Sequence, residues 1–127
     1  MLTVLPPVAY LLAAAFILWS AAERRPSGNG WMLPTVLGVL FLLLTLWTLA
    51  NEGVLQFWTN HVANLAGNQV WLDLLIAVCI AFYLIAPRAR AVGMRIIPWA
   101  IAVLATASLA LLPMLARLLW LEQRRRT

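Results

Sequence analysis

The sequence lacks most residues that build reactive or metal-binding sites. Among 127 residues there is no lysine, and there are four acidic residues, one cysteine and one histidine. Because Cys79 stands alone, the chain has no disulfide framework and no cysteine zinc site, and we expect it to act as a small buried apolar residue. His61 alone cannot form a two-histidine metal site or a bis-histidine haem site within one chain. The GxSxG, HExxH and glycine-rich phosphate-binding motifs are also missing. The sequence therefore predicts no catalytic residue, no metal site and no identified cofactor, and it disfavours an enzyme.

What the chain has in abundance is apolar surface. It is 65% hydrophobic and 10% charged, with a mean hydropathy of +0.93. Soluble domains are about half apolar and a quarter charged, and a small one could not bury this much apolar surface. The nine basic residues are all arginines at the ends of apolar runs, which favours contacts with lipid headgroups and not with nucleic acid. We therefore expect an integral membrane protein.

Four apolar runs predict four membrane-spanning helices in a single all-α domain, residues 1–127. They cover residues 4–22, 31–50, 70–86 and 96–119. Each is near the ~20 residues that cross ~30 Å of hydrocarbon. Pro87 is expected to end the third helix and Pro113 to kink the fourth. No basic region precedes Leu2, so the first helix is not expected to be a removable signal. The predicted fold is a four-helix membrane bundle.

A short amphipathic helix is expected at residues 53–66, between the second and third spans; a polar loop that caps the bundle is the alternative. Apolar and polar side chains alternate there with a helical period, which is typical of a helix lying in the membrane interface. The apolar face comprises Val54, Trp58, Val62 and Leu65, and the polar face comprises Gln56, Asn60, Asn64 and Asn68. In the fourth run, Ala102, Thr106 and Ala110 recur every four residues and predict a small-residue face for close helix packing.

The arginines also predict the orientation of the helices. Arginine-rich loops favour the cytoplasmic side. With four spans, the turns at residues 24–25 and 88–95 share one side, so both termini are predicted outside the cytoplasm. The run Arg124, Arg125 and Arg126 disagrees, because it would then also lie outside.

Asp73 is the most conspicuous candidate for a polar site. It lies about one turn inside the predicted third helix, behind Asn68. One interpretation is a proton or ligand site facing the bundle. The other, which we favour, is an acid at a helix end, stabilised by the helix dipole and by polar neighbours.

Aromatic residues near the amphipathic segment are the candidates for binding a cofactor. His61 could be the single axial ligand of a haem or chlorophyll-type ring, although an interfacial histidine is the simpler interpretation. Trp58 and Trp71 flank it, and an aromatic groove for a carotenoid or quinone stays open as an alternative. If a site exists, we expect Asp73, His61 and Trp71 to meet beneath the amphipathic segment.

Residues 51–122 resemble a family of small uncharacterised bacterial membrane proteins, classed as a domain of unknown function. The pattern is Asp73-Leu74-Leu75-Ile76, Arg90 with Gly93-Met94, Trp99, Ser108 and Leu112-Pro113. A plant and cyanobacterial carotenoid-related membrane family is similar more weakly, in its tryptophan, aspartate and proline landmarks. The first resemblance implies a multi-pass protein of the bacterial inner membrane, and neither resemblance implies a catalytic residue.

Three functions are compatible with these features. The first is a non-enzymatic accessory or assembly subunit of a larger membrane complex, such as a bioenergetic one, or a homo-oligomer. The second is a protein or enzyme that binds an isoprenoid, carotenoid or quinone. The third is a small transporter or channel, which the near absence of charge within the spans disfavours.

Overall fold

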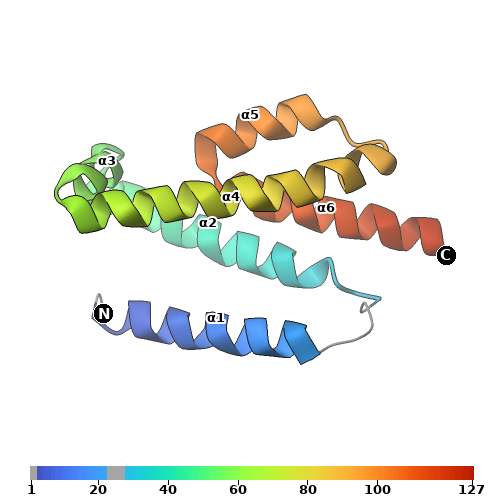
Figure 1. Cartoon of the computed structure of the whole chain (residues 1–127), viewed down its shortest axis with the longest axis horizontal. Coiled ribbons are helices and arrows are strands. Elements are labelled where there is room, and N and C mark those ends of the chain that lie inside the picture. The colour runs from blue at the N-terminus through green and yellow to red at the C-terminus, as the bar shows by residue number, and fades with distance from the viewer. Residues whose placement is uncertain (1–2, 23–27) are drawn as a thin grey trace.

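The computed structural model describes residues 3–22 and 28–127, and this part of the chain folds into helices without strands (Figure 1). The prediction of an all-α protein is confirmed. The helices are α1 (Leu5–Ala22), α2 (Met32–Glu52), α3 (Leu55–Val62), α4 (Leu65–Ala91), α5 (Ile96–Thr106) and α6 (Ser108–Arg126). Three of them, α1, α2 and α4, are long and apolar enough to cross a membrane. These three helices are consistent with a membrane protein.

The beginnings of α1, α2 and α5 follow from their prolines. Pro6, Pro34 and Pro98 each fall in the first turn of a helix, where a backbone N–H has no helical partner to lose. Helix α2 ends at Glu52, and Gly53 follows with φ of 78°, a conformation that favours glycine. The predicted starts of these three helices are therefore close to the observed ones.

Helix α4 begins earlier and ends later than the predicted third span of residues 70–86. It begins at Leu65 because the side chain of Asn64 caps it, accepting a hydrogen bond of 2.7 Å from the amide of Gly67. The expectation that Pro87 ends the helix is wrong, since α4 continues to Ala91. Beyond the proline, Ala89 becomes fully buried and Arg88 pairs with Glu122, and these contacts offset the lost backbone hydrogen bond.

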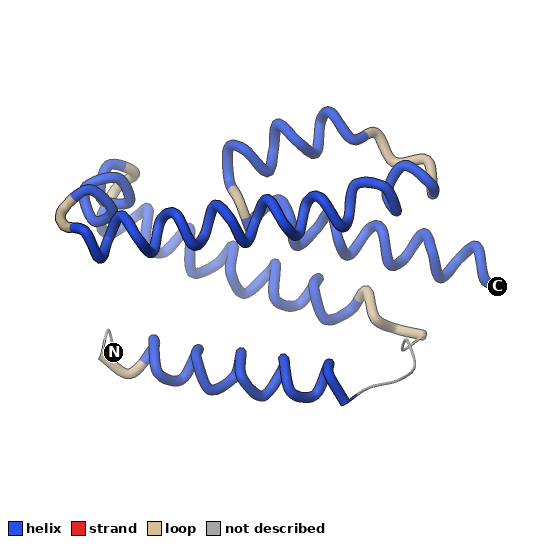
Figure 2. The backbone as a smooth tube through the Cα atoms, viewed as in Figure 1, coloured by secondary structure: helices blue, strands red, loops and turns tan. Residues whose placement is uncertain are grey.

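The predicted single helix over residues 96–119 is wrong. The chain breaks at Ala107, which has φ of 51° and ψ of −119°, and Figure 2 shows the short non-helical link between α5 and α6. The break lies six residues before Pro113, and α6 runs through this proline, so the expected kink at Pro113 stays a prediction. The small-residue face is divided as well, because Ala102 and Thr106 belong to α5 whereas Ala110 belongs to α6.

The break at Ala107 reverses the direction of the chain. Helices α5 and α6 contact each other, and α6 returns toward the turn that follows α4 (Figure 1). The run Arg124–Arg126 therefore lies at the same end of the molecule as the turn at residues 88–95, and not at the opposite end as four spans required. Arg125 Nη1 donates to the carbonyl of Ala91 at 2.5 Å, which ties the two segments together.

The buried core lies where α4, α5 and α6 converge. On α6, Ala110, Met114 and Leu118 recur every four residues and present one face to the other two helices. The remaining buried members of this core are Ile85, Ala89, Met94 and Val103. Helix α2 packs on α6, where a Cβ built at Gly38 would lie 3.5 Å from Cβ of Leu112. The core thus fixes α6 against the C-terminal half of α4.

Much apolar surface stays uncovered by the chain itself. Helix α1 has no buried residue and lies apart from the other helices (Figure 1). Cys79 is exposed on α4, so the expectation that it is buried is wrong. In a bilayer these surfaces face lipid tails or another protein.

Candidate functional site

The corner between α3 and α4 brings together some of the candidate residues. The rings of His61 and Trp71 lie with their centroids 4.7 Å apart and their planes tilted by 35°. The side-chain amide of Asn68 donates to the carbonyl of His61 at 3.0 Å and to that of Asn64 at 3.3 Å. The first of these bonds serves a carbonyl in the last turn of α3, where the helix leaves its carbonyls without helical partners. The carbonyl of Asn64, the N-cap of α4, also accepts from the backbone amide of Asn68 at 3.1 Å. Asn68 therefore joins the two helices at this corner.

Gly67 is what allows α3 and α4 to approach so closely. A Cβ built at Gly67 would lie 2.7 Å from the carbonyl oxygen of Asn60 and 3.1 Å from that of His61. Such distances are shorter than van der Waals contact, so any larger residue would push the helices apart. The sequence contains a signal for this corner, because Asn64 and Gly67 have the three-residue spacing of a helix cap and the backbone amide that donates to it.

The apolar face of the amphipathic segment points away from the chain. Helix α3 has no buried residue, and Trp58 is 65% exposed. A helix is present in residues 53–66 as predicted, shortened to Leu55–Val62. Its exposed apolar face suits a membrane interface. Trp58 does not join His61 and Trp71, so those two rings alone form the aromatic pair at this corner.

Asp73 does not belong to this corner. It follows Trp71 by two positions, which turns it about 200° around the helix, to the opposite side of α4. It is also the ninth residue of α4, because the helix begins at Leu65. The favoured explanation of Asp73 as a helix-end acid is therefore wrong, since the effect of the helix dipole fades after the first turn. The expected meeting of Asp73 with His61 and Trp71 is wrong as well.

The surroundings of Asp73 are apolar and open. Its side chain is exposed, and no hydrogen bond or ion pair reaches it from residues 3–22 or 28–127. Its neighbours on the same face of α4 include Ile76, Ile80 and Leu84, which are all exposed. Asp73 is therefore a carboxylate on an uncovered, otherwise hydrophobic helix face.

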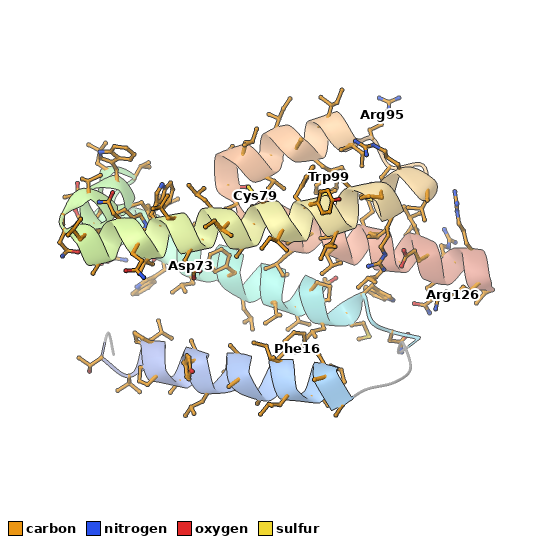
Figure 3. The ribbon with its side chains drawn as sticks, viewed as in Figure 1. Phe16, Asp73, Cys79, Arg95, Trp99 and Arg126 are labelled. Atoms are coloured by element: carbon orange, nitrogen blue, oxygen red, sulfur yellow. The ribbon has the colours of Figure 1, made fainter. Side chains whose placement is uncertain are left out.

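The opposite end of the molecule carries the described arginines, and we call it the arginine end. Figure 3 shows Arg95 and Arg126 toward this end and Asp73 toward the other. Its members are Arg88, Arg90, Arg95, Arg117, Arg124, Arg125 and Arg126. Glu122 is the acidic residue that pairs here, with its carboxylate bound to Arg88 by hydrogen bonds of 3.0 and 2.7 Å. The arginine end thus keeps a large excess of positive charge.

The arginine end also contains a groove, which the sequence did not predict as a site. We call it the tryptophan groove; its lining residues are Trp31, Thr35, Trp99, Pro113, Ala116, Arg117 and Trp120, and its volume is about 650 Å³. The sequence indicated only that these tryptophans lie near helix ends. Their convergence depends on the return of α6 toward the start of α2, which the sequence did not predict. The groove is open and lined mainly by apolar atoms.

The described residues contain no group of three or more histidine, cysteine, aspartate or glutamate side chains that could hold a metal ion. No protein-family model matches the chain, and neither a curated protein nor a solved structure matches it. The resemblance of residues 51–122 to a family of small bacterial membrane proteins therefore stays a prediction.

Proposed function

We propose that this protein is a non-enzymatic accessory or assembly subunit of a larger membrane complex of the bacterial inner membrane. The observation that carries the proposal is the position of Asp73 on a helix face that the described chain leaves uncovered. A charged side chain on such a face is stabilised by a polar partner from outside the chain.

The depth of Asp73 strengthens the argument. If Arg88 lies at one edge of the hydrocarbon, ~30 Å of hydrocarbon takes in about 20 residues of α4 before it. Asp73 then lies roughly 8 Å inside the far edge. A charged side chain costs about 2.5–3.5 kcal/mol at the centre of a bilayer on insertion scales, and less near its edge. A cationic or hydrogen-bonding group from a neighbouring subunit would remove this cost.

Helix α1 gives independent support. It has the length and hydropathy of a membrane span, yet none of its residues is buried against the chain. A spanning helix that does not pack on its own bundle is available to pack on another protein. We therefore assign α1 and the Asp73 face of α4 to contacts with partner subunits.

The same proposal includes an orientation. We place the arginine end in the cytoplasm, because arginine-rich segments next to spans favour that side. Helices α1, α2 and α4 then form three spans, and α5 and α6 form a hairpin that enters and leaves from the cytoplasmic side. Helix α5, with 11 residues, is about 16 Å long, which is too short to cross the hydrocarbon. The C-terminus is then cytoplasmic and the N-terminus is not. This replaces the orientation with both termini outside, and it removes the disagreement that the C-terminal arginines caused.

Co-purification in mild detergent followed by native mass spectrometry tests the proposed function. We expect the wild-type chain to carry a stoichiometric partner subunit, and Asp73→Asn to lose it. The matched control is Glu52→Gln, which neutralises an exposed acid at the end of α2. A wild-type chain that runs alone, without any partner subunit, would contradict the proposal.

Other outcomes would favour the alternatives. A coloured or extractable isoprenoid bound to the purified chain would favour a carotenoid- or quinone-binding protein, and its absorbance would also test His61 as a ring ligand. A bare homo-oligomer that conducts ions in liposomes would favour a channel or transporter.

Reporter fusions test the orientation separately. A reporter that is active only in the cytoplasm is expected to be active when joined after Thr127, and inactive when joined before Leu5. Activity at both positions or at neither would contradict three spans, because the two ends would then share one side.

A further inference from the structure

The tryptophan groove combines side chains from three helices at one level of the molecule. Trp31 lies at the start of α2, Trp99 lies in the first turn of α5, and Trp120 lies in α6. Among the described residues of the lining, Arg117 is the charged one, and it is exposed. Tryptophan prefers the boundary between headgroups and hydrocarbon. The groove therefore has the composition of a pocket at that boundary.

The polar groups of the groove are nearly all hydrogen-bond donors. An indole N–H and a guanidinium group donate but do not accept. The Thr35 hydroxyl already donates to the carbonyl of Trp31 at 2.8 Å. In the described part of the chain, no hydrogen bond or ion pair uses the guanidinium of Arg117 or the indole nitrogens of the three tryptophans. A ligand that matches these groups must supply acceptors and negative charge.

The nearest acid on α6 is not available to Arg117. Glu122 is held by two hydrogen bonds from Arg88, and it lies five positions along the helix, turned about 140° from Arg117. The other arginines of this end add positive potential, and the described lining of the groove contains no acidic residue that could neutralise it. The guanidinium of Arg124 lies over the ring of Trp120, with its Cζ 4.5 Å from the ring centroid. The positive charge of the groove is therefore left for a ligand.

The remaining lining is apolar. Pro113 and Ala116 contribute a smooth surface between the rings, and the apolar part of the lining exceeds the polar part. A small hydrophilic anion would leave this surface without a partner. An amphiphile would match both parts, with an anionic headgroup at Arg117 and an acyl chain along Pro113 and the ring faces.

We propose that the tryptophan groove binds the phosphate headgroup of an anionic phospholipid of the bilayer. Arg117 pairs with the phosphate, and the three tryptophans surround the glycerol region and the beginning of one acyl chain. This site is distinct from the Asp73 face and does not depend on a partner subunit.

Native mass spectrometry of the full chain, titrated in detergent with defined lipids, tests this proposal. We expect one phosphatidylglycerol molecule to bind in preference to phosphatidylcholine of the same acyl chains. Arg117→Gln should weaken the binding of phosphatidylglycerol about tenfold, because it removes one charge-assisted hydrogen-bonded contact. The matched control is Arg90→Gln, an exposed arginine of the same end that does not line the groove. It should leave the affinity almost unchanged.

Three results would overturn the proposal. Equal binding of the two lipids by the wild-type chain would show no headgroup recognition, and this comparison needs no variant to fold. An equal loss with Arg90→Gln and Arg117→Gln would show general attraction to the arginine end. Displacement of phosphatidylglycerol by an equal concentration of inorganic phosphate would show an anion site and not a lipid site.

Discussion

Replacing Ala107 by glycine tests whether the chain breaks between α5 and α6 or continues as one helix. The substitution should stabilise the protein if the helix is broken there and destabilise it if the helix is continuous. With φ of 51° and ψ of −119°, Ala107 has the backbone conformation of the first central residue of a type II′ turn. Glycine dominates that position because it has no Cβ to clash with the backbone. A non-glycine residue in such a sparsely populated conformation costs on the order of 1–3 kcal/mol.

The expected gain follows from two opposing effects. Ala107→Gly removes most of the strain, but glycine also makes the unfolded chain more flexible, which costs about 0.4–1 kcal/mol. The net effect is a stabilisation of up to about 2.6 kcal/mol. If residues 96–119 were instead one helix, as the sequence alone suggested, the same substitution would destabilise it by about 0.8–1 kcal/mol. The two architectures therefore predict opposite signs.

Thermal unfolding in detergent, followed by circular dichroism at a helix-sensitive wavelength, measures the difference. The control is Ala77→Gly, which replaces an exposed alanine inside α4 and should lower the free energy of unfolding by about 1 kcal/mol. A lower midpoint for Ala107→Gly, similar to that of the control, would refute the break at Ala107 and the return of α6 that depends on it.

Three further substitutions test other contacts by the same measurement. Gly67→Ala should destabilise the α3–α4 corner by about 1–3 kcal/mol, because its Cβ would lie 2.7 Å from the carbonyl oxygen of Asn60. The control is Gly28→Ala, whose Cβ would meet nothing within 4 Å, and equal stability of the two variants would contradict the close approach of α3 and α4. A double-mutant cycle of Arg88→Gln and Glu122→Gln should give a coupling of up to about 1 kcal/mol, since both side chains keep some exposure, at 50% and 21%; zero coupling would mean that the pair does not hold α4 to α6. His61→Ala should cost about 0.5–1.5 kcal/mol of ring contact with Trp71 whereas His61→Phe should keep most of it, and equal losses would argue against the ring pair.

The sequence identifies the candidate residues more reliably than it predicts which residues they contact. Asp73 is conspicuous in any apolar run, and His61 and Trp71 were correctly expected to meet. The predicted position of Asp73 at a helix end is wrong, because the apolar run begins at residue 70 whereas α4 begins at Leu65. The cap at Asn64 decides that start, and with it whether Asp73 lies near a helix end or in the third turn. The tryptophan groove could not be predicted, because its three rings come from segments up to 89 positions apart in the chain, Trp31 and Trp120.

The sequence by itself determined that the protein is helical, that its first three apolar runs form helices able to span a membrane, and that prolines mark the first turns of α1, α2 and α5. Its prediction of a fourth spanning helix at residues 96–119 is wrong. Composition, run length and proline position are local properties, and local physics converts them into helices. Only the tertiary structure decided the course of residues 96–126. Nothing local at Ala107 favours a break, since alanine is the best helix former and disfavours positive φ. The return of α6 buries Ala110, Met114 and Leu118 against α4 and α5 and pairs Glu122 with Arg88, and these distant contacts stabilise a backbone conformation that the local sequence disfavours.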